Sequence, residues 1–129
     1  MKPSKHTLHI YQGTSWQLRV RFKDPDGNAM DLSDYSGEMQ IRRSIHDTDP
    51  IISLDNDSNG GIIVDDQNAD FNLIARLTRA QTEDLPTHNT EIEDWVYDLR
   101  IWQNTDPDHT TIRLMQGRVF VYPAVTRDE

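Results

Sequence analysis

Two stretches of alternating residues constrain the fold of this chain more than any other feature of its sequence. The large side chains of the first are Trp16, Leu18, Val20 and Phe22, and those of the second are Trp95, Tyr97, Leu99 and Ile101. Successive side chains of a β-strand point to opposite faces of its sheet, so a period of two indicates a strand with one buried face. We therefore expect residues 16–22 and 95–102 to form two central strands that fill one core.

Shorter apolar runs between turn residues predict the remaining strands. They lie at residues 7–11, 37–45, 51–54, 62–64, 70–77 and 109–122. The cluster Asp24–Asn28, with its proline and glycine, predicts a tight reversal, and Asn104–Asp108 predicts a hairpin turn. We expect residues 51–54 and 62–64 to form a hairpin with a polar tip. The alternation changes phase in the last strand, which predicts a β-bulge at Gly117.

One short segment has the pattern of a helix. Thr78 is a good N-terminal cap, and Pro86 ends the segment about two turns later. A helix of that length is not stable alone in water, so we expect it to lie against the strands as a crossover. The fold class we predict is an all-β, antiparallel, immunoglobulin-like β-sandwich with this one short crossover helix. The alternative is an eight-stranded β-barrel.

Length and composition set the boundaries of the domain and of its chemistry. The 129 residues fit a single domain, 1–129, with an N-terminal arm at about 1–11 and a C-terminal tail at about 123–129. The chain has no cysteine, which excludes thiolate chemistry. Its formal charge of -9 argues against nucleic-acid partners. No apolar run approaches the roughly 20 residues of a membrane span, so we expect no membrane partner.

The strongest local motif has the spacing of a calcium-binding loop. Oxygen-bearing side chains stand at Asp55, Asp57, Asn59 and Asp66, with Gly60 at the sixth position. Alternate oxygens in such a loop point at one Ca²⁺. The flanks have strand composition where a calcium loop has helices, and the last ligand is Asp where Glu is usual. The alternative interpretation is a polar hairpin tip between two strands. Apart from this candidate Ca²⁺, we expect no cofactor.

Catalytic constellations are not found in the sequence. The acid pairs at Asp24–Asp26, Asp47–Asp49 and Asp106–Asp108 fit turn chemistry better than general acid–base catalysis. The histidines lack metalloprotease spacing, and there is no nucleophile elbow or phosphate-binding loop. We expect no catalytic residues and therefore not an enzyme.

Several residues are candidates for an interface. Trp102 and Val96 are out of phase with the core side of their strand, so an exposed indole beside a valine would mark a contact surface. Arg19 and Arg21 share the outer side of one strand, and Arg42 follows on another. Together they would form a cationic stripe for an acidic partner. The alternative is a solvated face with cross-strand ion pairs.

Several short motifs follow one another in a characteristic order. They are Gly13–Trp16, Asp24–Gly27, Met30–Gly37, Met39–Arg42, Asn59–Ile62, Leu77–Thr78, Tyr97–Leu99, Arg113–Gly117 and Val125–Arg127. This order resembles that of small β-sandwich proteins encoded in the tail and baseplate gene clusters of bacteriophages and prophages. The series covers nearly the whole chain. One departure is Ala69–Asp70, where a glycine is expected in the turn before the next strand.

The resemblance implies an immunoglobulin-like virion structural protein of the tail, baseplate or fibre attachment, assembled in the host bacterial cytoplasm. Its partners would be other tail and baseplate proteins, with the chain itself in many copies as a homo-oligomer. Exposed strand edges, Trp102 and the N-terminal arm would dock, and the arm or the tail would add a strand to a neighbouring sheet. The alternative is a calcium-dependent or carbohydrate-binding module that contacts the host surface, with an aromatic shelf and Ca²⁺ at Asp55–Asp66.

Overall fold

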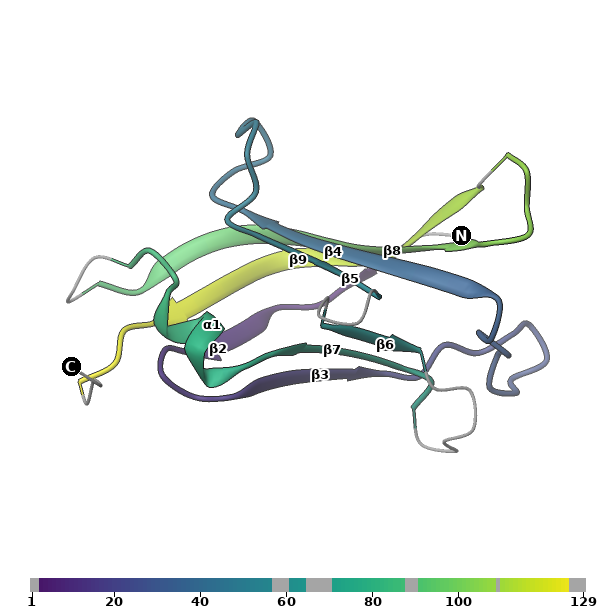
Figure 1. Cartoon of the computed structure of the whole chain (residues 1–129), viewed down its shortest axis with the longest axis horizontal. Coiled ribbons are helices and arrows are strands. Elements are labelled where there is room, and N and C mark those ends of the chain that lie inside the picture. The colour runs from purple at the N-terminus through teal and green to yellow at the C-terminus, as the bar shows by residue number, and fades with distance from the viewer. Residues whose placement is uncertain (1–2, 57–60, 65–70, 88–90, 109, 126–129) are drawn as a thin grey trace.

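A computed structural model of the chain shows two β-sheets packed face to face (Figure 1). It describes residues 3–56, 61–64, 71–87, 91–108 and 110–125. The elements in chain order are β1 (Ser4–Lys5), β2 (Leu8–Tyr11), β3 (Trp16–Val20), β4 (Tyr35–Arg42), β5 (Ile52–Asp55), β6 (Ile62–Val64), β7 (Leu73–Leu77), α1 (Arg79–Glu83), β8 (Glu93–Gln103) and β9 (Thr111–Tyr122). The prediction of an all-β sandwich is confirmed.

The larger sheet, sheet A, is built around β8. Its strands lie in the order β1-β9-β8-β4-β5, and β2 also pairs with β9. Trp95, Tyr97, Leu99 and Ile101 of β8 are at most 5% exposed. The second alternating stretch is therefore a central strand, as predicted. The turn at residues 104–108 joins β8 to antiparallel β9, which confirms the hairpin.

The smaller sheet, sheet B, has the order β3-β7-β6. Here the prediction was wrong in one respect, because β3 is an edge strand and not a central one. Its large side chains face the core but stay half-buried: Trp16, Leu18, Val20 and, just beyond the strand, Phe22. Among the described residues, β3 pairs with a neighbouring strand on one side only.

The predicted hairpin of residues 51–54 and 62–64 does not form. Strand β5 pairs with β4 in sheet A, whereas β6 pairs with β7 in sheet B. An isolated bridge between Asp55 and Gly61 marks where the two sheets meet at this edge. Gly61 has φ +87°, and a Cβ there would lie 2.7 Å from the Arg76 carbonyl oxygen. The positive φ and this close contact with β7 therefore require glycine at this position.

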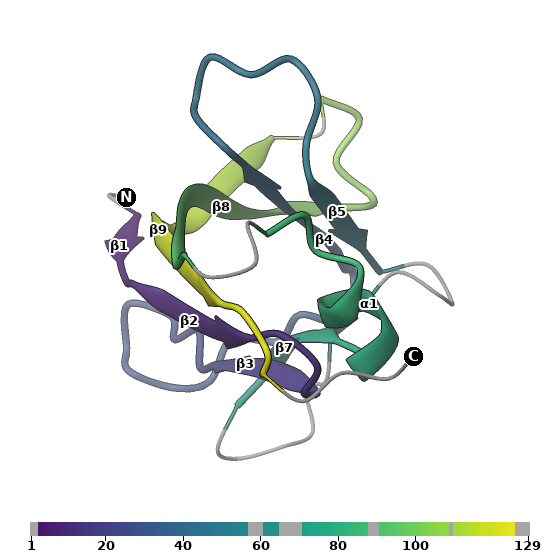
Figure 2. The same ribbon diagram turned by 90° about the vertical axis from the view of Figure 1, so that its left-hand side faces the viewer.

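The N-terminal segment is part of the sandwich and not a free arm. Strands β1 and β2 both pair with β9, in parallel orientation (Figure 2). Leu8 and Ile10 are 3% and 0% exposed. Their alternation gives β2 an apolar side, and burying that side in the chain's own core accounts for the difference from the expected arm.

The phase shift of β9 lies earlier than predicted. The register with β8 shifts between Leu99 and Arg100, so Leu114 is the extra residue of the bulge. Gly117 has another role: a Cβ built there would collide with the His6 carbonyl group. The missing side chain therefore lets the N-terminal segment cross β9 closely.

The helix α1 carries the chain from sheet B to sheet A, as expected for a crossover. The Thr78 hydroxyl accepts the Gln81 N–H at 3.2 Å, and the Gln81 side chain accepts the Thr78 N–H at 2.8 Å. This reciprocal capping box holds a helix of only five residues. Leu85, just after the helix, is 4% exposed and belongs to the core.

Candidate interaction surfaces

The outer face of sheet A carries three of the five predicted interface residues. Val96 and Trp102 of β8 and Arg42 of β4 are all half-buried there, because their neighbours in sequence point into the core. Arg42 lies opposite Val96 in the strand register. Val96 and Trp102 share the face but are not side by side, since six residues of strand span roughly 20 Å.

Cross-strand ion pairs cover much of this face. Arg100 Nη2 lies 2.5 Å from Glu38 Oε1, and Arg113 Nε lies 3.5 Å from Asp98 Oδ2. These arginine side chains are 49% and 56% exposed. Such exposed pairs contribute about 0–1 kcal/mol each to stability. Their main effect is to fix the directions in which the charges point.

A shallow concavity of about 980 Å³ lies over this face. It is lined by Lys5, His6, Thr7, Glu38, Gln40, Arg42, Ile45, Val96, Tyr97, Asp98, Arg100, Arg113, Gln116, Gly117 and Arg118. Five of the chain's 13 Lys and Arg residues line it, against two of its 22 Asp and Glu residues. We call it the cationic concavity.

The other two predicted interface residues lie on the opposite side of the molecule. Arg19 belongs to β3 in sheet B, and Arg21 follows it just beyond the strand. Both are exposed, and the Arg19 guanidinium lies 5.1 Å from the centre of the Phe71 ring. The expected stripe that joins them to Arg42 does not form, because β3 and β4 belong to different sheets.

The predicted calcium ligands fall mostly outside the described residues. Asp57, Asn59 and Asp66 lie there, and Asp55 is the last residue of β5, opposite Glu38 in the register with β4. Within the described ranges, no group of three or more His, Cys, Asp or Glu side chains is placed to hold a metal. The segment connects two sheets and does not form the tip of a hairpin.

The acid pairs in turns have structural roles. Asp24 Oδ1 accepts the N–H groups of Asp26 and Asn28, both at 3.0 Å. The carboxylate of Asp106 accepts the N–H groups of Asp108 and Thr110 at 3.0 and 3.1 Å. Turn chemistry, the preferred interpretation of these two pairs, is confirmed.

An aromatic strip on the outer side of the β2–β9 pair was not predicted. The rings of Tyr11 and Tyr122 are stacked with their centres 4.6 Å apart. The centre of the His9 ring lies 5.8 Å from that of Phe120 and 5.9 Å from that of Tyr122. The His9 Nδ1 is also 2.9 Å from the Tyr122 hydroxyl. Tyr11 is 56% exposed. The alternation within β9 could have predicted this strip, since the inward direction of Val119 and Val121 places Phe120 and Tyr122 on the outer side.

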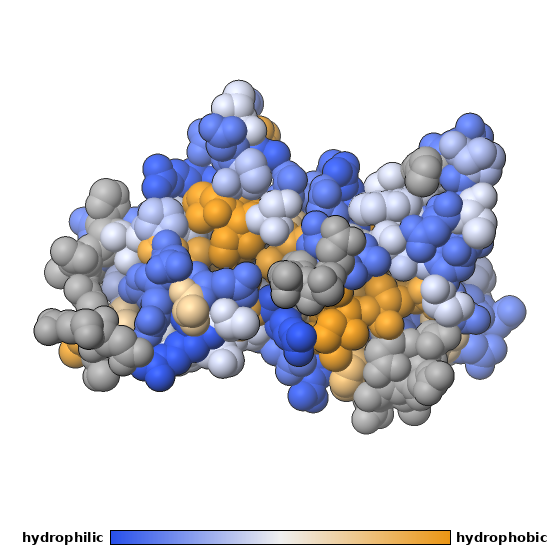
Figure 3. All heavy atoms as spheres, viewed as in Figure 1, coloured by the Kyte–Doolittle hydropathy of each residue, from blue (hydrophilic) through white to orange (hydrophobic). Residues whose placement is uncertain are grey.

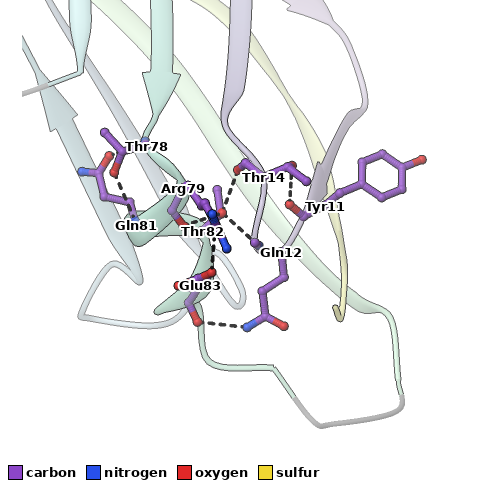
Figure 4. Close-up of polar contacts among 9 residues, drawn as sticks. Tyr11, Gln12, Thr14, Thr78, Arg79, Gln81, Thr82 and Glu83 are labelled. Carbon is purple, nitrogen blue, oxygen red and sulfur yellow. Dashed lines mark hydrogen bonds and ion pairs between the residues drawn. The ribbon is translucent and has the colours of Figure 1, made fainter. Parts of the chain in front are cut away.

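A polar cluster around the buried Thr82 closes one end of the sandwich (Figure 4). The Thr82 hydroxyl of α1 donates to the Thr14 carbonyl at 2.8 Å and accepts the Gly13 N–H at 3.1 Å. The Gln12 amide nitrogen donates to the carbonyls of Glu83 and Leu85 at 3.1 and 3.3 Å. The turn from β2 to β3 is thereby tied to the helix. These partners satisfy each other, so we interpret the cluster as structural.

Tyr97 is a titratable group whose pKa is displaced by its surroundings. The residue is 5% exposed, and its hydroxyl donates to the His6 carbonyl at 2.7 Å. Burial raises the pKa of Tyr97 from 10.0 to about 12. A neutral, hydrogen-bonded phenol of this kind is part of the core.

Apolar side chains also gather along the side of the sandwich where the sheets meet, between hydrophilic margins (Figure 3). A small groove lies there between β5 and α1. Its apolar lining consists of Ile51, Ile52, Leu54, Leu85 and Pro86. The strand edge of β5 and this groove together form a third candidate surface.

Two further findings bear on the class of protein. Among the described residues, no helix has the length and apolar character needed to cross a membrane. In comparisons with protein-family models and with curated proteins, none matched this chain.

Proposed function

We propose that this chain is a structural protein of a bacteriophage virion, an adaptor in the tail, baseplate or fibre attachment that acts through protein–protein contacts. The observation that supports this proposal most is the outer face of sheet A. Neither sheet B nor α1 lies over it (Figures 1 and 2), and it presents Trp102, Val96 and Arg42 among charged pairs. The order of sequence motifs that resembles phage tail and baseplate proteins supplies the biological setting.

The chemistry of this face suits a protein partner. Tryptophan and arginine are enriched at the energetic centres of interfaces, and a rim of charges selects the partner. The sheet behind it is rigid, because Met39, Leu99 and Ile101 are fully buried beneath it. A rigid, uncovered sheet face loses little entropy on docking. We infer a role in holding neighbouring chains in place and not in chemistry.

The proposal is tested by looking for the chain in purified particles. We expect an antibody against it to label tails or baseplates, and an immunoblot of density-banded particles to contain it. Trp102→Gln should lower its incorporation about tenfold, the effect of losing roughly 1.4 kcal/mol at an interface. Arg21→Gln, on the other side of the molecule, is the matched control and should incorporate normally. Particles that lack the wild-type chain would reject the proposal.

The aromatic strip favours a second candidate, a carbohydrate-binding module. Aromatic rings bind the apolar faces of sugars, and Tyr11 stands exposed at the edge of sheet A. A glycan array should then show binding that Tyr11→Ala removes and Trp102→Gln leaves intact. Calcium added during thermal unfolding tests the metal-dependent form, which predicts a midpoint several degrees higher. No glycan bound by the wild-type chain would leave the adaptor as the better proposal.

A further inference from the structure

We propose that the cationic concavity receives the acidic surface of a second copy of this chain, so that copies associate head to tail. The inference rests on the proposed function in one respect, the presence of many copies in one particle. It adds the surface, the partner and the geometry of the contact.

The first argument for this contact is the distribution of charge over the molecule. The lining of the concavity holds Lys5, Arg42, Arg100, Arg113 and Arg118 against Glu38 and Asp98, a net formal charge of +3. Since the whole chain has a formal charge of -9, the rest of it has -12. The concavity therefore has the opposite net charge to the rest of the chain taken as a whole.

The lining also has the contact chemistry of an interface. Its floor includes the half-buried Val96, and its rim carries Ile45, which is 77% exposed. Arg118 and Lys5 are exposed at its margin. Apolar contacts at the centre and cations around them suit a protein surface that carries carboxylates. A long polyanion fits less well, because it would run on from the concavity across the acidic remainder of the molecule.

The sign of the charge also decides the symmetry. Two cationic concavities repel each other, so a twofold contact through this face is disfavoured. A concavity that meets a different, acidic surface of the next copy makes a heterologous contact, which continues into a ring or a filament. Ring assembly is compatible with a multicopy component around a tail axis.

The segment 24–34 is the part of the described surface that we assign to the concavity of the next copy. Its eleven residues contain four aspartates and no basic residue. It joins the end of sheet B to the start of β4, and none of its residues lines the concavity. Asp26 is exposed at the tip of its turn, where Gly27 has φ +88°.

Two charge-reversed variants test the contact in both directions. The first, Lys5→Glu with Arg118→Glu, changes the net formal charge of the lining from +3 to -1. It leaves the Arg100–Glu38 pair in place and removes the ion pair between Arg118 and Asp94. The second, Asp26→Lys with Asn28→Lys, changes the net formal charge of residues 24–28 from -2 to +1 and that of the whole segment 24–34 from -4 to -1. Sedimentation velocity at about 0.05 M and about 0.5 M salt measures assembly, because exposed charge pairs are screened as salt rises. Circular dichroism and the thermal midpoint verify folding.

We expect the wild-type chain to form species larger than a dimer at low salt and to dissociate at high salt. Each variant alone should remain the 15.0 kDa monomer. A mixture of the two variants should assemble again. The acidic turn of the first fits the basic concavity of the second, and the basic turn of the second fits the acidic concavity of the first.

Four results would overturn the inference: a wild-type monomer at low salt, a dimer that does not grow, assembly unaffected by either variant, or a mixture that stays monomeric. A wild-type monomer that instead binds a hexaglutamate peptide would point to an acidic partner other than itself. The proposed function fails separately, when the chain is absent from purified particles. A chain that is found in particles and is monomeric in solution would reject this inference alone.

Discussion

Strands β8 and β3 have the same alternating pattern in sequence, yet the structure holds them in different ways. In β8 the four large inward side chains are at most 5% exposed. In β3 and the residues just after it, all four are only half-buried. The difference teaches that alternation tells which side of a strand is apolar, whereas the tertiary structure around the strand decides how far that side is buried.

What β3 lacks in packing is supplied at its two ends by hydrogen bonds. Thr82 and Asn72 are both 0% exposed, and they are the buried polar residues of the described chain. Thr82 binds the backbone just before β3. The Asn72 amide binds the Phe22 N–H and carbonyl, both at 2.8 Å, and the Met30 carbonyl at 2.9 Å. The edge strand is thus fixed by satisfied polar groups, and the central strand by apolar contacts.

The largest expected effect comes from truncating a leucine in each strand. We expect Leu99→Ala in β8 to lower the free energy of unfolding by about 2–5 kcal/mol, since it leaves a cavity in the core. Leu18→Ala in β3 should lower it by about 1–2 kcal/mol, because solvent already reaches that side chain. Urea unfolding of the two variants measures the difference. Equal losses would show that the half-burial of β3 has no energetic meaning.

Removal of the Asn72 side chain is the second prediction. Asn72→Ala leaves the backbone groups of Phe22 and Met30 without their buried partner, and we expect a loss of about 2–3 kcal/mol. The matched control is Asn104→Ala, whose side chain accepts a hydrogen bond from Ser36 at an exposed position. The control should change stability by about 0.5 kcal/mol or less. If both substitutions cost the same in urea unfolding, the end of β3 is not held as we describe.

Thr82→Val tests the other end of β3 with a side chain of nearly the same shape. It removes the bonds to Thr14 and Gly13, and we expect a loss of about 1–2 kcal/mol. Hydrogen exchange should show faster exchange at the Gly13 amide while the β8 amides keep their relative protection. Uniformly faster exchange throughout the sandwich would contradict a local role for Thr82.

The smallest expected effect is the pH dependence of the free energy of unfolding that Tyr97 of β8 causes. Its pKa in the folded chain, about 12, is higher than the ordinary 10.0, so its contribution is complete below pH 10 and is lost as pH rises towards 12. Tyr97→Phe should cost about 1 kcal/mol at neutral pH, since it loses the hydrogen bond to His6. The variant should then lose less stability than wild type between pH 10 and 12. Parallel unfolding curves across that range would show that Tyr97 does not ionise with unfolding.

The same contrast shows how much of the candidate surfaces could be predicted. The outward direction of Val96 and Trp102 followed from their phase within β8. The outward direction of Phe120 and Tyr122 could have been predicted in the same way from their phase within β9. The cationic concavity did not follow, because it combines Lys5, Arg42 and Arg118 from three strands that lie far apart in sequence. Arg19 and Arg42 looked alike in sequence and lie on opposite faces of the sandwich.

By itself, the sequence determined the local features of this protein. Side-chain alternation set which side of β8 and β3 is apolar, the turn at 24–28 needed its aspartate and glycine, and Thr78 with Gln81 defined the start of α1. These features depend on residues within one strand or turn of each other, so they can be recognised without a partner.

The tertiary structure alone decided which strands become neighbours. It put β3 at an edge, separated β5 from β6, paired β2 with β9 and shifted the bulge to Leu114. The physical reason is that pairing partners are chosen by total burial over the whole chain, whereas a period of two fixes only which face of each strand is apolar.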